Sequence, residues 1–200
     1  AAFVSSDEVR CTAPLNSIGT VAVAVNNNGY DYSEASIEFE YIDIAVTRAL
    51  HPSWGPTSGG TEVSVTGSNF INSEDSPMLC LFEKFAESSS LTDAVISPIV
   101  TFVSSTEVVC EIPPSFEVPN ASSGMQGRIS VRVTNNGQDY SAVSTTFTYY
   151  DAPRVQRLVP TSGPSSGGTR LQVFGANFLQ SSELQCIFGD TAATVASWRS

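Results

Sequence analysis

The feature that most constrains the fold of this 200-residue chain is an internal repeat. Residues 50–70 read LHPSWGPTSGGTEVSVTGSNF, and residues 158–178 read LVPTSGPSSGGTRLQVFGANF, so prolines, glycines and an Asn-Phe pair recur at a shift of 108 positions. Residues 23–41 match residues 131–149 at the same shift. One period shared by two separate alignments indicates a tandem array of one structural unit.

A third match sets the layout of the array. Residues 3–14, FVSSDEVRCTAP, align with FVSSTEVVCEIP at a shift of 99, so one loop is nine residues longer in the second copy. We therefore predict the C-terminal half of one repeat at 1–44, a complete repeat at 45–152 and the N-terminal half of a third at 153–200. The array is expected to continue at both ends.

The composition of the chain favours strands over helices. Apolar residues make up 41% of the sequence, whereas charged residues make up only 14%, and the abundance of Gly, Pro, Ser, Thr and Val suits short strands joined by tight turns. Alternating apolar residues predict seven short strands in the complete repeat, which make an all-β sandwich. The predicted strands are 46–50, 62–67, 78–82, 99–103, 108–112, 127–134 and 144–150.

The last two predicted strands are expected to form an antiparallel hairpin. Residues 135–137, Asn-Asn-Gly, supply positive-φ residues for a tight turn, and residues 27–29 repeat that turn. Side chains at alternate strand positions point to the same face of a sheet. One such set is therefore predicted to face the core: Val131, Val133, Phe147 and Tyr149.

The four cysteines occupy two positions of the repeat. Cys80 and Cys186 each begin a Cys-x-Phe pattern, while Cys11 and Cys110 each lie shortly before a proline. We predict a Cys80–Cys110 disulfide, with Cys11 and Cys186 pairing to cysteines outside these 200 residues. Such a bridge stabilises a domain by about 3–4 kcal/mol and implies an oxidising compartment. Buried free thiols in a cytosolic protein are the alternative.

A glycosylation sequon also points to secretion. Asn120-Ala121-Ser122 is the only Asn-x-Ser/Thr sequence of the chain, and it lies in the loop that differs in length between copies. Such a loop is free to carry a glycan or a contact. Together with the predicted disulfide, the sequon leads us to expect an extracellular or cell-surface protein with a glycan on Asn120.

The charge of the chain argues against nucleic-acid partners. Twenty acidic residues against nine basic ones give a net charge of −11, and such a surface repels phosphate backbones and anionic membranes. We therefore expect neither nucleic acid nor an anionic membrane as a binding partner.

Metal ligands are sparse. His51 is the only histidine and there is no Cys-x-x-Cys pair, so no zinc site with ordinary spacing can be assembled. Asp43 and Asp151 occupy equivalent domain junctions, with Glu38 and Glu40 near the first, and carboxylates suit calcium. However, no Asp-x-Asp-x-Asp loop is present, and acidic edges that keep sheets apart explain the same residues. Calcium is an alternative that we do not favour.

One sequence pattern mimics a catalytic motif. Residues 163–167 satisfy Gly-x-Ser-x-Gly, the pattern of a hydrolase nucleophile elbow, which requires a following helix. A strand is predicted to follow instead, and the corresponding residue of the complete repeat is Thr57 rather than serine. We interpret the motif as a turn and expect no catalytic residues and no cofactor.

The ordered motifs of the repeat resemble the IPT/TIG domain, an immunoglobulin-like fold found in plexins and transcription factors. The resemblance rests on residues 52–61 (PSWGPTSGGT), Val63, Val65, Gly67, Asn69-Phe70, Cys80-Leu81-Phe82, Val109-Cys110, Pro113, Asn136-Gly137, Tyr140-Ser141 and Phe147-Thr148-Tyr149. It implies a seven-stranded sandwich used as a spacer or binding module. Independently, Gly55, Gly59 and Gly60 with Pro56 are expected to reverse the chain between the first two strands. The stretch from Cys80 to Cys110 is long for the family.

These patterns favour a non-catalytic extracellular module with a structural or adhesive role, in a stalk, fibre or cell-surface filament. The expected partners are other domains of the same chain and other proteins, with homotypic contact between edge strands as a further hypothesis. The alternative is the stalk of a plexin- or Met-like receptor ectodomain that mediates protein–protein binding. A transcription-factor role is opposed by the charge, and a carbohydrate-binding module would need exposed aromatic platforms beyond Trp54 and Trp198.

Overall fold

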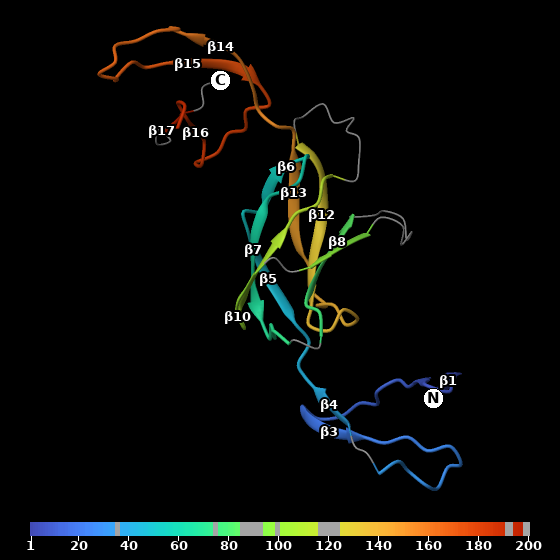
Figure 1. The fold of residues 1–200 in the computed structure, drawn as a ribbon. Coiled ribbons are helices and arrows are strands. Elements are labelled where there is room, and N and C mark those ends of the chain that lie inside the picture. Colours follow the sequence, from blue (N-terminus) through green and yellow to red (C-terminus); the bar gives the residue numbers. More distant parts are fainter. Residues whose placement is uncertain are drawn as a thin grey trace. The chain divides into compact units, whose positions relative to one another are not determined.

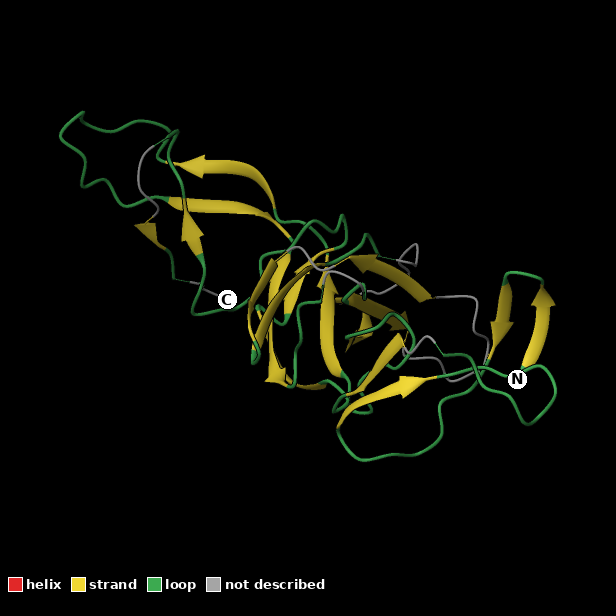
Figure 2. Cartoon of the chain, turned by 60° about the horizontal axis from the view of Figure 1, so that its bottom comes forward, coloured by secondary structure: helices red, strands yellow, loops and turns green. Residues whose placement is uncertain are grey.

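The computed structural model describes residues 1–34, 37–73, 76–84, 94–98, 101–115, 125–190 and 194–197. These residues contain seventeen strands. Figure 2 shows strands and no helix, which confirms the all-β prediction. Consequently, no helix in the described part of the chain is long and apolar enough to cross a membrane. Two compact units are distinguished, Ala1–Ile44 and Ala45–Ser200.

The strands follow one another along the chain with short connections. Ala1–Ile44 holds β1 (Ala2–Ser5), β2 (Glu8–Arg10), β3 (Gly19–Val23) and β4 (Ile37–Tyr41). The complete repeat holds β5 (Val46–His51), β6 (Trp54–Pro56), β7 (Glu62–Ser68), β8 (Leu79–Lys84), β9 (Ala94–Pro98), β10 (Thr101–Ser104), β11 (Glu107–Glu111), β12 (Met125–Thr134) and β13 (Thr145–Tyr150). The remaining strands are β14 (Arg154–Val159), β15 (Gln172–Ala176), β16 (Gln185–Cys186) and β17 (Thr194–Val195).

The complete repeat is an immunoglobulin-like sandwich of two sheets, which form the two central layers in Figure 1. One sheet has the order β10-β11-β7-β5 and the other the order β6-β13-β12-β8-β9. All neighbouring pairs are antiparallel except β13 and β6, which run parallel. We call residues 45–98 the front half of the repeat and residues 101–152 its back half. Each half contributes strands to both sheets.

The core lies between the two sheets and is built by alternate side chains. Along β13, buried positions alternate with partly exposed ones, and Phe147 and Tyr149 meet edge to face with ring centroids 5.3 Å apart. The four predicted core residues of β12 and β13 are confirmed, since Val131, Val133 and Phe147 are 0% exposed and Tyr149 is 1% exposed. Side chains from both halves of the repeat complete the core: Ala45, Val63, Val65, Phe70, Cys80, Phe82, Val108, Cys110, Ile112 and Ile129.

β12 and β13 pair antiparallel, as the sequence predicted, but the connection between them is not the predicted tight turn. Of residues 135–137, only Gly137 has a positive φ, 75°. Asn136 forms a local turn in which its Oδ1 accepts hydrogen bonds from the backbone of Gln138 and Asp139, at 3.0 and 2.9 Å. Asn135 instead turns its side chain toward the front half of the repeat, as described below, because its amide satisfies backbone groups there.

The predicted chain reversal at residues 55–60 was also partly wrong. Gly59 and Gly60 do have positive φ, 73° and 77°, but Gly55 lies in β6, which crosses to the other sheet and pairs with β13. A Cβ at Gly55 would lie 2.7 Å from Cζ of Phe147. Gly55 is therefore required for close packing rather than for a turn. Strands β6 and β9 bring the described complete repeat to nine strands instead of seven.

A tyrosine hydrogen bond and an asparagine backbone conformation of residues 45–152 recur in residues 1–44 and 153–200. Tyr149 Oη donates a hydrogen bond to the Pro113 carbonyl at 2.7 Å, and Tyr41 Oη donates to the Pro14 carbonyl at 2.9 Å. At the other end of the repeat, Asn69 and Asn177 have nearly equal left-handed φ, 63° and 62°. The same local structure therefore recurs at aligned positions of residues 1–44, 45–152 and 153–200.

Candidate functional site

The structure joins Cys80 and Cys110 in the disulfide that the repeat pattern predicts. Cys80 lies on β8 and Cys110 on β11, so the bridge connects the two sheets, with Cα atoms 6.3 Å apart. Both cysteines are fully buried. Cys11 is exposed and Cys186 is half-buried, and neither is in a disulfide.

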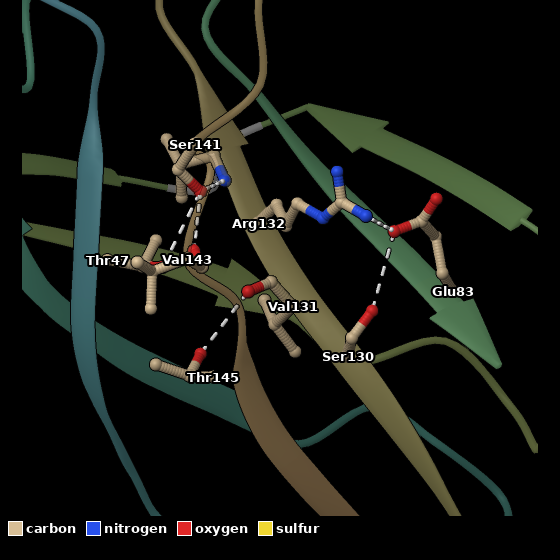
Figure 3. Close-up of polar contacts among 9 residues, drawn as sticks. Thr47, Glu83, Ser130, Val131, Arg132, Ser141, Val143 and Thr145 are labelled. Atoms are coloured by element: carbon tan, nitrogen blue, oxygen red, sulfur yellow. Dashed lines mark hydrogen bonds and ion pairs between the residues drawn. The ribbon is translucent and has the colours of Figure 1, made fainter. Parts of the chain in front are cut away.

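The disulfide joins the front half of the repeat to the back half, and a cluster of hydrogen bonds joins the same two halves. Thr47 of β5 and Ser141 after β12 are buried, and both hydroxyls donate to the carbonyl of Val143 (Figure 3). Ser141 Oγ also accepts a hydrogen bond from the Val133 backbone N–H at 3.3 Å. Because buried hydroxyls and backbone groups need partners, this arrangement fixes β5 against the β12–β13 connection.

The Asn135 side chain makes a second polar link between the two halves. Its Nδ2 donates to the Asn69 carbonyl at 2.7 Å, and its Oδ1 accepts from the Ile71 backbone N–H at 3.2 Å. Sequence reasoning treated Asn135 only as a turn residue. The sequence did contain a signal for a further role of this asparagine. It recurs as Asn27, two residues before Gly29, and that glycine already supplies the positive φ of the turn.

Burial determines the protonation state of Tyr149, the tyrosine that recurs as Tyr41. The hydroxyl of Tyr149 is enclosed where β13 meets the segment after β11, and burial raises its pKa to about 12. The hydroxyl therefore stays neutral and keeps donating to Pro113 well above physiological pH.

The outer face of the β12 sheet carries an ion pair that sequence reasoning did not single out. Arg132 binds Glu83 with an N–O distance of 2.8 Å, and Ser130 donates to the same carboxylate at 3.4 Å (Figure 3). Trp54 and Tyr150 meet edge to face on a neighbouring part of this sheet, with centroids 5.7 Å apart. Polar residues at alternate positions of β12, Ser130 and Arg132, could have predicted this partly covered outer face from the sequence.

The residues considered for catalysis form a turn. Residues 163–167 close with a hydrogen bond from the Gly167 N–H to the Pro164 carbonyl at 3.0 Å, and the next element is β15. His51, at the end of β5, is exposed.

The acidic residues considered for calcium lie at exposed or half-buried positions. Asp43, Glu38 and Glu40 are exposed and Asp151 is half-buried. In the part of the chain that the structure describes, no three His, Cys, Asp or Glu side chains gather in a way that could hold a metal ion. The predicted glycosylation site, Asn120, lies outside the described residues.

The partial repeats expose apolar surface that the complete repeat buries. Val25 and Phe39, in Ala1–Ile44, are 42% and 43% exposed, whereas their counterparts Val133 and Phe147 are 0% exposed. A hollow of about 350 Å³ lies on the same unit, lined by residues 25–28 and 31–33.

Comparison with known proteins gives a family and several relatives. The family model described as IPT/TIG domain matches residues 45–149 and 153–200. Fibrocystin-L from Homo sapiens is 29% identical over 178 residues, covering 88% of this chain and 4% of that protein. Plexin-A4 from Danio rerio is 26% identical over 146 residues (72% and 7%), and Plexin-A3 from Rattus norvegicus is 29% identical over 143 residues (70% and 7%).

Among solved structures, a plexin A4 full extracellular region is similar, with a TM-score of 0.46, 21% identity, and coverage of 80% of this chain and 12% of that one. The chain spans less than a tenth of the length of the curated relatives above. The relationship to fibrocystin-L and plexins confirms the predicted extracellular or cell-surface location, and the buried disulfide agrees with it.

Proposed function

The chain belongs to the IPT/TIG domain family, and on this premise we propose that it is a non-catalytic spacer and binding module in a tandem array of immunoglobulin-like sandwiches outside the cell. We divide it into the back half of one repeat (1–44), a complete repeat (45–152) and the front half of a third (153–200). In such an array the domains set length and present loops to protein partners.

The observation that carries this proposal is that the same close packing of a glycine against a backbone carbonyl recurs in successive repeats. A Cβ at Gly67 would overlap the Val46 carbonyl, and one at Gly175 would overlap the Arg154 carbonyl. The counterpart residues are 108 positions apart in both cases. Identical local packing at a fixed period is typical of a chain whose units are built to be joined in series.

The short junctions support a spacer rather than a set of loosely tethered domains. Four residues separate β4 from β5, and three residues separate β13 from β14. The second junction ends in Pro153, whose ring fixes φ. A connection this short gives little reach, so successive domains should have a restricted range of orientations.

Small-angle scattering of two, three and four tandem copies of residues 46–153, joined through the natural junction Asp151-Ala152-Pro153, tests the proposal. The maximum dimension should increase by a nearly constant length with each added copy. A matched series with eight Gly/Ser residues inserted after Ala152 should give a broader, more compact distance distribution. Equal distributions for the two series would contradict a stiff spacer.

A second candidate is the stalk of a plexin- or Met-like receptor, in which these sandwiches support a separate ligand-binding head. The relationship to plexins over about 70% of this chain favours it. Sequence beyond these 200 residues separates the two candidates, because a semaphorin-like propeller upstream or a membrane span and kinase downstream would indicate the receptor.

We also propose an N-linked glycan on Asn120. The sequon lies in the loop that differs by nine residues between copies. Peptide mass mapping of secreted material before and after treatment with an amidase that removes N-glycans should show a shift at Asn120, and an unmodified asparagine would exclude the glycan.

A further inference from the structure

The turn that follows β12 contains an Asn-Gly pair, and the turn at residues 26–33 contains another. These pairs are Asn136-Gly137 and Asn28-Gly29, which lie 108 positions apart. Asn-Gly is the dipeptide most prone to lose the side-chain amide, because glycine has no side chain to shield the backbone nitrogen that attacks the asparagine carboxamide. Both copies of the turn therefore carry a sequence that is chemically short-lived in a flexible chain.

The loss of the amide requires freedom at two groups. The nitrogen of Gly137 must give up its proton and reach Cγ of Asn136. A new N–Cγ bond then forms, the Cγ–Nδ2 bond breaks, and ammonia leaves with that proton. Water afterwards opens the cyclic succinimide at either carbonyl and gives aspartate or isoaspartate. A turn can therefore prevent the change by holding the nitrogen or by holding the carboxamide.

The nitrogen of Gly137 is held by Thr134. Its N–H donates to Thr134 Oγ1 at 3.1 Å, and the N–H of Asn136 donates to the same oxygen at 3.2 Å. Thr134 is 0% exposed, so water has little access to its hydroxyl. An amide anion beside this hydroxyl would be poorly solvated, and the nitrogen of Gly137 therefore retains its proton.

The carboxamide of Asn136 is held at both of its polar atoms. Oδ1 accepts hydrogen bonds from the N–H groups of Gln138 and Asp139, at 3.0 and 2.9 Å, and from the hydroxyl of Thr134 at 3.1 Å. Nδ2 donates to Asp139 Oδ2 at 2.8 Å. Bringing Cγ onto the nitrogen of Gly137 would pull the carboxamide away from these partners, so the attack must first break the turn.

The same arrangement recurs around Asn28. Its Oδ1 accepts from the N–H groups of Tyr30 and Asp31, both at 3.0 Å, and its Nδ2 donates to Asp31 Oδ2 at 2.7 Å. The Gly29 N–H donates to Asn26 Oδ1 at 3.1 Å, so an asparagine here takes the part that threonine has in the complete repeat. All of these hydrogen bonds are local to one turn, which makes the arrangement a property of the repeat.

We propose that Asn136-Gly137 is a latent site of isoaspartate formation that Thr134 and Asp139 keep closed. The corresponding turn keeps Asn28-Gly29 closed in the same way.

Closure of the site preserves the contact between the two halves of the repeat. In the modified chain a carboxylate replaces the amide that donates to Asp139, so two negative charges meet where a hydrogen bond now lies. In isoaspartate the backbone also gains a methylene group directly after Asn135, whose side chain binds the Asn69 carbonyl and the Ile71 N–H. Loss of the Asn136 amide would therefore disturb the neighbouring link to the front half.

The rate of amide loss in the full 200-residue chain tests the proposal, because the two sites serve as references for each other. The chain is kept at mildly alkaline pH, and samples taken over time are digested with trypsin. Mass spectrometry after chromatography quantifies asparagine, aspartate and isoaspartate at positions 28 and 136. Both sites should react at least about tenfold more slowly in the folded chain than in the chain unfolded in guanidinium chloride, since several hydrogen bonds must break first.

Two substitutions open the site from different sides. Thr134→Val removes the hydroxyl that holds the Gly137 N–H, and Asp139→Ala removes the acceptor for Asn136 Nδ2. Each should increase the rate at Asn136 about two- to tenfold relative to Asn28 in the same chain, which is the rate factor of one ordinary hydrogen bond.

Matched variants separate hydrogen bonding from general loosening of the turn. Gln138→Ala should leave the ratio of the two rates unchanged, because Gln138 is exposed and holds Asn136 through its backbone N–H. Asp139→Asn keeps an oxygen that can accept from Asn136 Nδ2 and should stay close to the unsubstituted rate.

Three results would overturn the proposal: equal rates at Asn136 in the folded and unfolded chains, an unchanged ratio in Asp139→Ala, or an equal increase in Asp139→Ala and Gln138→Ala. Thr134 is buried and its substitution can loosen the whole repeat. Asp139 is exposed, so its variants decide the question whether or not Thr134→Val folds.

Discussion

At the residue scale, Gly67 lies where β5 and β7 approach too closely for any side chain. A Cβ there would overlap the Val46 carbonyl and lie 2.7 Å from Cζ of Phe70. Gly67→Ala should destabilise the complete repeat by about 3 kcal/mol, because backbone or a buried ring must move. Gly60→Ala faces open space at a φ of 77° and should cost only about 1–2 kcal/mol.

Urea unfolding followed by Trp54 fluorescence, in a Trp198→Phe background, measures both substitutions. Trp54 and Trp198 are the two tryptophans of the chain, so the background isolates a reporter on the complete repeat. Equal costs for the two alanines would show that conformational preference, rather than the close approach of β5 and β7, requires glycine at position 67.

Tyr149 should make the stability of the complete repeat depend on alkaline pH. Burial raises its pKa to about 12, whereas an unfolded tyrosine ionises near 10. The stabilisation is therefore fully present below pH 10 and is lost as the pH rises to 12, by about 3 kcal/mol over two units. Unfolding free energies measured from pH 8 to 12 should fall accordingly.

Tyr149→Phe provides the comparison for this alkaline loss. The variant should be about 1 kcal/mol less stable at pH 8, since the bond to the Pro113 carbonyl is gone, but its stability should fall much less between pH 10 and 12. Tyr150→Phe should retain the wild-type decline. A decline of the same size in Tyr149→Phe would assign the effect to other groups.

At the scale of elements, the sequence predicted strands wherever an alternating run was long enough to carry a period. β13 was recognised because apolar residues alternate over its six residues, which are buried at every second position, and β7 because Val63 and Val65 alternate with polar residues. β6 was missed because Trp54-Gly55-Pro56 is too short for a period and has the composition of a turn. Its backbone nevertheless pairs, with the Thr148 N–H donating to the Ser53 carbonyl at 2.9 Å.

Contacts between the two halves of the repeat show the same limit of sequence-based prediction, which is that only patterned residues can be placed. Cys80 and Cys110 could be paired from the sequence because two repeat positions hold all four cysteines. The hydrogen bonds from Asn135 to the front half could not be predicted, because an Asn-Asn-Gly sequence is typical of a turn whatever the first asparagine side chain binds. Contacts between segments far apart in the chain leave no local periodicity.

Asn135→Ala should weaken the docking of the two halves. The substitution removes the hydrogen bonds that Asn135 makes with the Asn69 carbonyl and the Ile71 N–H, and the loss of two hydrogen bonds at a part-buried site should cost about 1–3 kcal/mol in unfolding free energy. Asn136→Ala, which loses only a local turn, should cost less than about 1 kcal/mol. Urea unfolding of the two variants compares them, and a larger loss for Asn136→Ala would contradict the interpretation.

At the scale of the molecule, the described complete repeat differs from the partial repeats in how many neighbours each strand has. β12 pairs with β13 on one side and β8 on the other, whereas β14 pairs with β15 alone. Two-stranded ribbons are marginally stable in water, and proteases cut segments that open easily. Within these 200 residues, β14 and β15 are therefore expected to open more readily than β12.

Limited trypsin digestion at low protein concentration measures this inequality. Arg157, on β14, should be cleaved at least about tenfold faster than Arg132, which lies in the centre of β12 and is held by Glu83. Cleavage after Arg170 should likewise precede cleavage after Arg132. Equal rates at Arg132 and Arg157 would contradict the expected difference in local stability between β12 and β14.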